Sequence, residues 1–195
     1  MNRSPRTERA AGWRHGVAAI EFALVAPLIL LMMLAGADLT IFLRTAMRLD
    51  ETATGLALVV TQYQNLYTSD FTNLFNAAQT IAGTTTVTGL FGATIITGIV
   101  NSSGKQTIAW QQRSPSATFN SVFGRAVGAA PVLPNNYTLP AGGVLIAVEV
   151  FTSTTPWVFS ARLMGASSIA SLRSYALYQP RLGSLATVTS GNRPP

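Results

Sequence analysis

The sequence predicts an α+β protein: a long N-terminal helix that crosses a membrane, then an exported domain with a short second helix and an antiparallel β-sheet. Between residues 17 and 43 the only ionisable side chains are Glu21 and Asp38. As a helix this stretch is about 40 Å long, more than the hydrocarbon core of a bilayer at about 30 Å. From residue 84 onward Thr, Val and Ile dominate, which is typical of strands. At 195 residues the chain is long enough for one domain and an anchor.

Composition divides the chain into a basic cytoplasmic leader (1–16), a transmembrane helix (17–43), an exported α+β domain (44–183) and a polar tail. We expect this tail, residues 184–195, to be disordered. Four arginines against one glutamate give the leader a charge of +3, half of the total of +6. Basic residues before an apolar helix stay in the cytoplasm, so the part after the helix is exported. The other charges are scattered and form no basic face, which argues against nucleic-acid binding.

Three interpretations of the apolar helix compete, and Glu21 separates them. In a cleaved signal peptide, Ala35-Gly36-Ala37 would be the cleavage site, but signal peptides have no use for a carboxylate in the apolar stretch. In a plain membrane anchor, Glu21 would be incidental. A carboxylate costs about 2.5–3.5 kcal/mol at the bilayer centre, and less near the interface. In the third interpretation, which we favour, the chain uses this carboxylate.

Cleavage after Gly16 would explain Glu21. The new amino terminus would be Val17, and Glu21 would be the fifth residue of the mature chain. Positions i and i+4 share one face of a helix, so the carboxylate would lie one turn from a new ammonium group. The two could neutralise each other within one chain, or each could pair with a neighbouring chain. A charge that is costly alone and satisfied in a complex favours association.

Gly16, Glu21 and Phe22 follow a short basic leader and open an apolar helix, and this arrangement resembles the type IV prepilin processing site. The continuation from Ala23 to Pro27 and its Leu-rich run are similar to TadE/TadF-like pseudopilins of the tight-adherence (Tad/Flp) pilus system. That family also carries an acidic residue late in the helix, and Asp38 fits as a second polar contact inside the membrane.

The rest of the chain resembles this family more loosely, in the short helix after Asp70 and in the region from Gly143 to Arg181. One departure is that mature type IV pilins begin with Phe, whereas this chain would begin with Val17, so terminal methylation is not implied.

The resemblance implies a minor pilin or pseudopilin in the bacterial inner membrane, with its C-terminal domain periplasmic and, after processing, extracellular in a pilus. Its implied partners are a prepilin peptidase, other pilin subunits and the Tad secretion machinery, and its implied role is in pilus assembly, adhesion and biofilm formation. The rival hypothesis is an uncleaved anchor that presents a periplasmic binding or envelope-interaction module.

In the exported domain, apolar spacings of three and four extend the first helix to about Asn65. A second helix is predicted over 70–82, between an N-cap at Thr68 or Ser69 and a stop at Gly83. Strands at 93–100 and 106–111 flank a hairpin turn, and 144–151 reads as a central strand. The predicted remainder is an irregular stretch at 114–136 with a short helix near 119–127, an aromatic turn at 154–157 and a closing strand at 168–178.

No catalytic, cofactor, metal or small-molecule site is expected. The chain has no Cys, and its only His, His15, lies in the leader that cleavage would remove. Gly104-Lys105 has the wrong spacing for a phosphate-binding loop. Glu149 interrupts an apolar strand without a second acid nearby, so we expect it to face the edge of the sheet or to pair with an arginine, Arg162 or Arg173, rather than to be catalytic.

Overall fold

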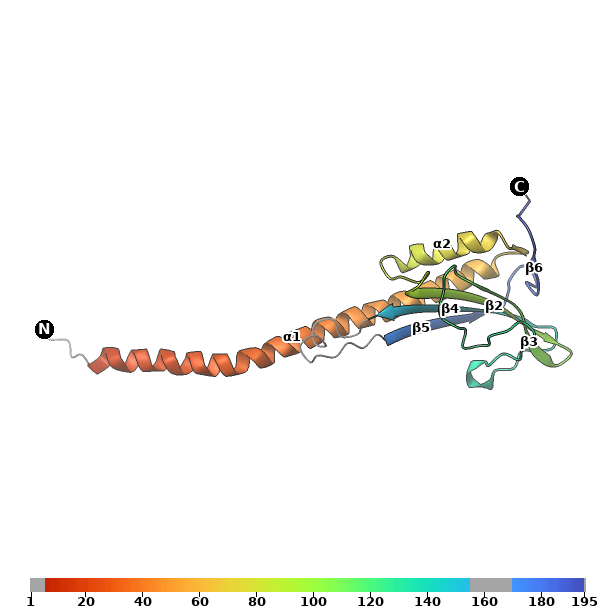
Figure 1. The fold of residues 1–195 in the computed structure, drawn as a ribbon. Helices are drawn as coiled ribbons and strands as arrows, with labels where there is room; N and C mark the ends of the chain where they lie inside the picture. Colours follow the sequence, from red (N-terminus) through yellow and green to blue (C-terminus); the bar gives the residue numbers. More distant parts are fainter. Residues whose placement is uncertain (1–5, 155–169, 195) are drawn as a thin grey trace. The chain divides into compact units, whose positions relative to one another are not determined.

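The computed structural model describes residues 6–154 and 170–194, and the side chains of 17–154 and 171–194. Its elements confirm the α+β class (Figure 1). The chain forms two compact units. The described part of the first is residues 6–42, and the described part of the second is 43–154 with 170–194. The predicted aromatic turn, apart from Thr154, and the start of the closing strand lie outside the described residues.

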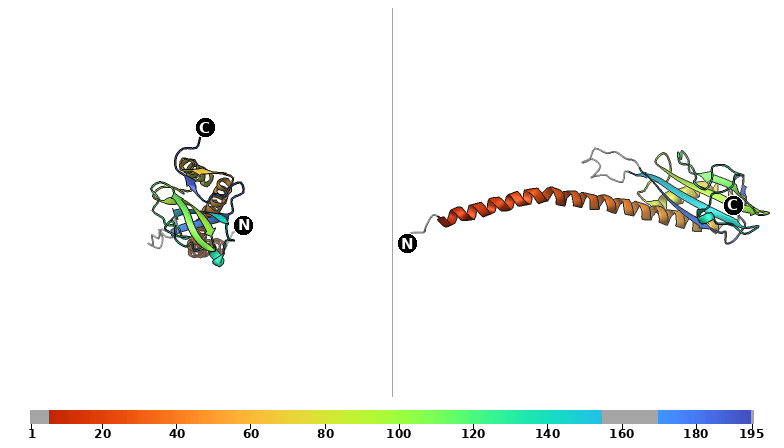
Figure 2. Two further views of the ribbon diagram at one scale, coloured as in Figure 1. Left: turned by 90° about the vertical axis from the view of Figure 1, so that its right-hand side faces the viewer. Right: turned by 90° about the horizontal axis from the view of Figure 1, so that it is seen from below.

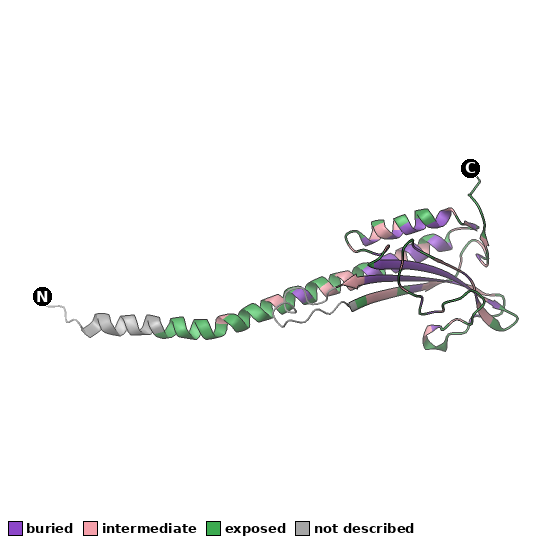
Figure 3. Ribbon diagram, viewed as in Figure 1, coloured by how far each residue is buried: buried purple, intermediate pink, exposed green. Residues whose placement is uncertain are grey.

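Helix α1 extends from Arg6 to Thr61 with Pro27 inside it, so the predicted continuation beyond the apolar stretch is confirmed. In the first unit its side chains from residue 17 on are almost all exposed (Figure 3). In the second unit one face of the same helix is buried. The helix ends four residues before the predicted Asn65, where Gln62 and Tyr63 donate backbone hydrogen bonds to carbonyls three residues earlier and the chain turns into strand β1 (Leu66–Tyr67).

The second unit is built on a four-stranded antiparallel sheet in the order β3-β2-β4-β5. The strands are β2 (Gly92–Ser102), β3 (Lys105–Arg113), β4 (Val144–Thr154) and β5 (Ala170–Tyr178). The predicted hairpin joins β2 to β3 through Ser103 and Gly104, both with positive φ as a two-residue hairpin loop requires. Strand β4 is an inner strand, as its apolar sequence predicts.

Two helical segments cover one face of the sheet (Figures 1 and 2). Helix α2 (Asp70–Ala82) has the predicted bounds, and the chain leaves it at Gly83 with a φ of 63°. Its Phe71 packs edge-on against Trp110 of β3, with 5.7 Å between the ring centroids. The segment 43–61 of α1 lies beside β5, since Asp50 accepts a hydrogen bond from Ser174 and Thr61 accepts one from the Arg181 amide. Burial of both helices against the sheet makes the main hydrophobic core.

The segment 114–143 covers the opposite face of the sheet and places Phe123, Leu133 and Leu139 against β2, β3 and β4. The helix predicted near 119–127 is wrong, since the only helix in this segment is the short 3-10 turn η1 (Pro134–Asn136). Gly124 and Gly128 have positive φ, and backbone groups of Gly128 and Ala129 bond to both sides of Ile108 on β3. Pairing with the sheet edge therefore replaces the helix.

The C-terminal residues are ordered, contrary to the disordered tail expected from composition. Strand β6 (Val188–Thr189) pairs in parallel with β1. Beyond it, the Gly191 amide donates to Thr68 Oγ1 at 3.0 Å, and the Arg193 amide donates to Ser69 Oγ at 3.2 Å. These partners lie more than 120 residues apart in sequence, which explains why local composition did not reveal them.

Candidate functional site

The predicted cleavage site lies within α1, whose backbone is helical through Gly16 and Val17. A glycine inside a helix is destabilising by about 1 kcal/mol relative to alanine, so Gly16 is an intrinsically weak point of this helix. On its C-terminal side, Val17, Ile20 and Phe22 have 54%, 65% and 69% of their surface exposed. The segment that a peptidase would read is thus unobstructed by the described part of the chain.

Glu21 is exposed on the same part of α1. Among residues 17–154 and 171–194, no side chain or backbone group forms a hydrogen bond or ion pair with it. Four residues separate it from Val17, which places the two Cβ atoms about 5–6 Å apart on one helix face. An ammonium group created at Val17 would therefore be within reach of the carboxylate.

The apolar residues after Glu21 form a continuous exposed surface on α1. This is the one helix within the described residues that is long and apolar enough to cross a membrane. Such a helix suggests a membrane anchor, because leaving so much apolar surface in water is unfavourable. The exposed large side chains are Leu24, Val25, Leu28, Ile29, Leu30, Leu31, Met32, Met33, Leu39 and Ile41.

Asp38 differs from Glu21 in being fully buried. Seventeen residues separate the two acids, about 26 Å along a helix. The structure therefore does not bring them together, and they are two separate polar positions on the apolar helix. A role for Asp38 in contacts between subunits stays a prediction.

The second unit contains a buried ion pair that fulfils the expectation for Glu149. Its side chain is fully buried and lies 3.0 Å from Arg173 Nε on β5. The Nε–H does not point at the carboxylate oxygen, so this contact is an ion pair rather than a directed hydrogen bond. The Ser121 hydroxyl and the Val122 amide also donate to the carboxylate. Arg162, the alternative partner, lies outside the described residues.

The same arginine lies between two rings. Its guanidinium carbon is 5.0 Å from the centroid of Phe123 and 4.9 Å from that of Tyr175. The Glu149 carboxylate on β4 thus holds the covering segment, residues 114–143, through Ser121 and Val122, and it is joined to β5 through Arg173. Among the described residues, the polar contacts of the Glu149 carboxylate are with Ser121, Val122 and Arg173, and each of them serves this attachment.

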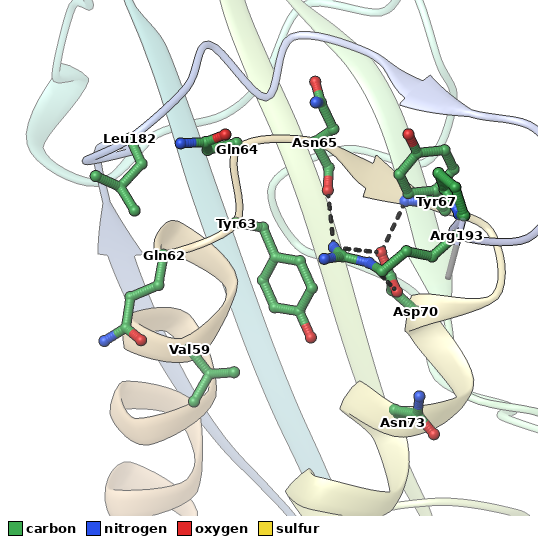
Figure 4. Close-up of a pocket in the computed structure, with 11 residues that line it drawn as sticks. Val59, Gln62, Tyr63, Gln64, Asn65, Tyr67, Asp70, Asn73, Leu182 and Arg193 are labelled. Carbon is green, nitrogen blue, oxygen red and sulfur yellow. Dashed lines mark hydrogen bonds and ion pairs between the residues drawn. The ribbon is translucent and has the colours of Figure 1, made fainter.

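A groove of about 850 Å³ opens between the C-terminal end of α1, the start of α2 and the C-terminal residues (Figure 4). Arg193 crosses it, with Nε 3.2 Å and Nη2 3.1 Å from the two Asp70 oxygens and Nη2 3.1 Å from the Asn65 carbonyl oxygen. Its guanidinium also stacks 4.8 Å from the Tyr63 ring centroid. The hydrogen bond to Asp70 raises the pKa of Arg193, so the guanidinium remains charged over the physiological range.

The sequence did not reveal this C-terminal clasp, the contacts of Arg193 with Asp70 and Asn65, because Arg193 was expected to lie in a disordered tail. The acid itself was visible, since Asp70 is the only carboxylate between residues 55 and 107. A lone acid in such a long stretch with few charges is a signal that predicts a cationic partner from a distant part of the chain. Among the described residues, no group of three or more His, Cys, Asp or Glu side chains could hold a metal ion.

Comparison with known proteins bears on the N-terminal helix. Residues 16–57 match the family of TadE-like proteins, and the match begins at the glycine of the predicted cleavage site. Neither the curated proteins nor the solved structures include a match to this chain. The matched segment spans Glu21, the apolar surface and the first turns that enter the second unit. This similarity suggests association with pilus components in general. The N-terminal segment of this chain, residues 16–57, is thus similar to TadE-like proteins.

Proposed function

We propose that this protein is a minor pilin or pseudopilin of a Tad-type pilus, processed by a prepilin peptidase between Gly16 and Val17. The observation that carries the proposal is the combination of an exposed apolar helix, a TadE-like match over 16–57 and a Glu21, four residues after Val17, that pairs with none of the described residues. Each feature alone fits a plain anchor. Together they fit a helix that is both inserted in a membrane and used for assembly.

Assembly would follow from electrostatics. Before cleavage, Glu21 carries an uncompensated charge in or near the hydrocarbon region, which is unfavourable. Cleavage creates an ammonium group one helical turn away, and packing of several helices lets each carboxylate meet an amine in a medium of low dielectric constant. Phe22 and the leucines after it would supply the apolar contact between helices. Asp38 would supply a second polar contact within the assembly.

The remaining roles follow from this assignment. The basic leader would hold the N-terminus in the cytoplasm, so the second unit would face the periplasm of a bacterial inner membrane and reach the exterior in a pilus. Other pilin subunits and the Tad secretion machinery would be its partners. Its contribution to adhesion and biofilm formation would be structural rather than enzymatic.

The groove beside Arg193 favours a second candidate function, an uncleaved anchor that presents a periplasmic binding module. The two hypotheses differ in what Glu21 does. A binding module needs no carboxylate in its anchor, whereas the pilin hypothesis requires one.

The test replaces Glu21 by glutamine in the full chain, with Glu51→Gln as the matched control on the same helix outside the apolar stretch. Membrane insertion should be unchanged or improved, because a charge costing about 2.5–3.5 kcal/mol at the bilayer centre is removed. Co-purification with pilin subunits and the number of pili per cell should fall for Glu21→Gln alone. Cleavage is followed by mass in the same cells, so a loss of assembly is not mistaken for a loss of processing. Normal piliation of a cleaved Glu21→Gln protein would contradict the proposed role.

A further inference from the structure

Leu90 and Phe91 form an exposed apolar pair at one end of the second unit. They have 65% and 67% of their surface exposed, and in the described part of this unit no other two consecutive large apolar residues are exposed. Their backbone is nonetheless fixed. The Leu90 carbonyl oxygen accepts from the Thr118 hydroxyl at 3.3 Å, and the Phe91 carbonyl oxygen accepts from the Ser153 amide at 2.6 Å. The fold therefore holds two apolar side chains in solvent on an ordered segment.

The position of this pair follows from the register of the sheet. Gly92 is opposite Thr152 on β4, and Thr152 is opposite Leu172 on β5. Leu172 precedes Ser174 by two residues, and Phe91 precedes Gly92 by one. Phe91 is therefore three strand residues, about 10 Å, from the level of Ser174.

Helix α1 gives the same level independently. Asp50 contacts Ser174, and Thr61 lies at Arg181, so this part of α1 runs in the same direction as β5. Leu43 precedes Asp50 by seven residues, which is about 10 Å of helix. Phe91 and Leu43 are therefore at the same level of the second unit. In Figure 1, β2 begins at the end of this unit where its α1 segment begins.

Leu43 is where the apolar stretch of the sequence stops, and Arg44 is the first basic residue after it. A helix that crosses a bilayer leaves the hydrocarbon region at such a boundary, and arginines there lie among the lipid phosphates. Leu43 and Met47, four residues apart and so on one helix face, are also exposed at this end, by 51% and 64%. Exposed Leu, Met and Phe side chains at the level of the boundary have the chemistry of a surface that inserts between lipid headgroups.

We propose that Leu90 and Phe91 dock the second unit on the surface of the bilayer that holds its own α1 helix. The occupant of this apolar surface is lipid, because within the second unit the pair lies at the level of Leu43, the residue at which the apolar stretch of the sequence ends. Docking would hold the domain against the membrane until the subunit is drawn into an assembly. The inference rests on the membrane-spanning part of the proposed function and does not require cleavage or pilus assembly.

The test uses the full chain in phospholipid vesicles and exploits the absence of cysteine. Single variants Leu30→Cys, Leu90→Cys and Leu182→Cys carry an environment-sensitive fluorophore, and quenching by nitroxide-labelled lipid is compared with quenching by aqueous iodide. Leu182 is the matched control, because it is an exposed leucine (61%) that follows Arg181 at the far end of α1. The two ends of this α1 segment are about 27 Å apart.

We expect strong lipid quenching at position 30, clear lipid quenching at 90 and none at 182. Adding Phe91→Asp to the Leu90→Cys protein should abolish lipid quenching at 90, because a carboxylate is repelled from the headgroup region. Lipid quenching at 30 with equal, purely aqueous quenching at 90 and 182 would overturn the inference and leave the membrane helix intact. Absence of lipid quenching at 30 would overturn both the membrane helix and the inference that rests on it.

Discussion

Replacing Glu149 by glutamine and by alanine tests whether the buried ion pair holds the covering segment on the sheet. The carboxylate is fully buried, while the side chain of Arg173 is 26% exposed. Glutamine retains the shape and an acceptor for the Val122 amide but loses the charge that attracts Arg173, and hydrogen bonds to charged groups contribute about 1.5–3 kcal/mol. Alanine removes every contact and leaves Arg173 largely buried without its partner, which costs about 3–5 kcal/mol.

These free energies translate into melting temperatures. For domains of this size 1 kcal/mol shifts Tm by about 2–4 °C, so we expect a drop of about 3–12 °C for Glu149→Gln and about 6–20 °C for Glu149→Ala. The control is Glu51→Gln, because Glu51 pairs with Arg48 on the surface and both side chains are 58% exposed. An exposed pair contributes at most about 1 kcal/mol.

The assay is thermal unfolding of the detergent-solubilised chain, followed by circular dichroism in the β-sheet region. Hydrogen exchange at the Val122 and Phe123 amides should accelerate in the same variants. The Val122 amide donates to Glu149 itself, and the Phe123 amide donates to Ser121 Oγ, which is bonded to Glu149. If both Glu149 variants melted within 2 °C of the wild type, a range an exposed pair would explain, the ion pair would not hold this segment.

Two further predictions concern packing and the C-terminal clasp. Gly98→Ala should destabilise the second unit by about 1–3 kcal/mol, because its Cβ would overlap the buried Trp110 ring. The control Gly55→Ala in α1 has room for its Cβ and should be neutral or stabilising. A melting temperature of Gly98→Ala equal to that of the wild type would refute this prediction. Arg193→Ala should speed hydrogen exchange at the Thr68 and Gly191 amides, whose hydrogen bonds join the C-terminal residues to the segment before α2. The control Lys105→Ala should not change this exchange. Unchanged protection of the two amides in Arg193→Ala would show that strand pairing alone orders these residues.

Elements with local signals could be predicted from the sequence. Helix α2 has the predicted bounds because Gly83 takes a positive φ of 63°, which glycine adopts readily, although Ser69 makes no side-chain cap. The β2–β3 hairpin follows from the small residues at Ser103 and Gly104. The apolar helix and its single early carboxylate were equally visible, because composition alone marks them.

Elements decided by distant partners could not be predicted. Phe119 to Val127 has the spacing of a short helix, yet its neighbours Gly128 and Ala129 bond to Ile108, and no local pattern encodes that pairing. The composition of the C-terminal residues predicts disorder, because the partners that order them, Thr68 and Asp70, are distant in sequence. Glu149 shows the intermediate case: an acid in an apolar strand predicts a cationic partner, but only the β4–β5 register selects Arg173.

The proposed pilin function depends most on cleavage after Gly16, which would turn the apolar helix into an assembly helix. The most direct measurement is the intact mass of the full chain after expression with its cognate prepilin peptidase, with Gly16→Val as an uncleavable control. The account predicts a mature chain that begins at Val17, and no shortening of the control. An intact chain that retains Met1, or a chain that begins at Asp38 after cleavage as a signal peptide, would contradict it.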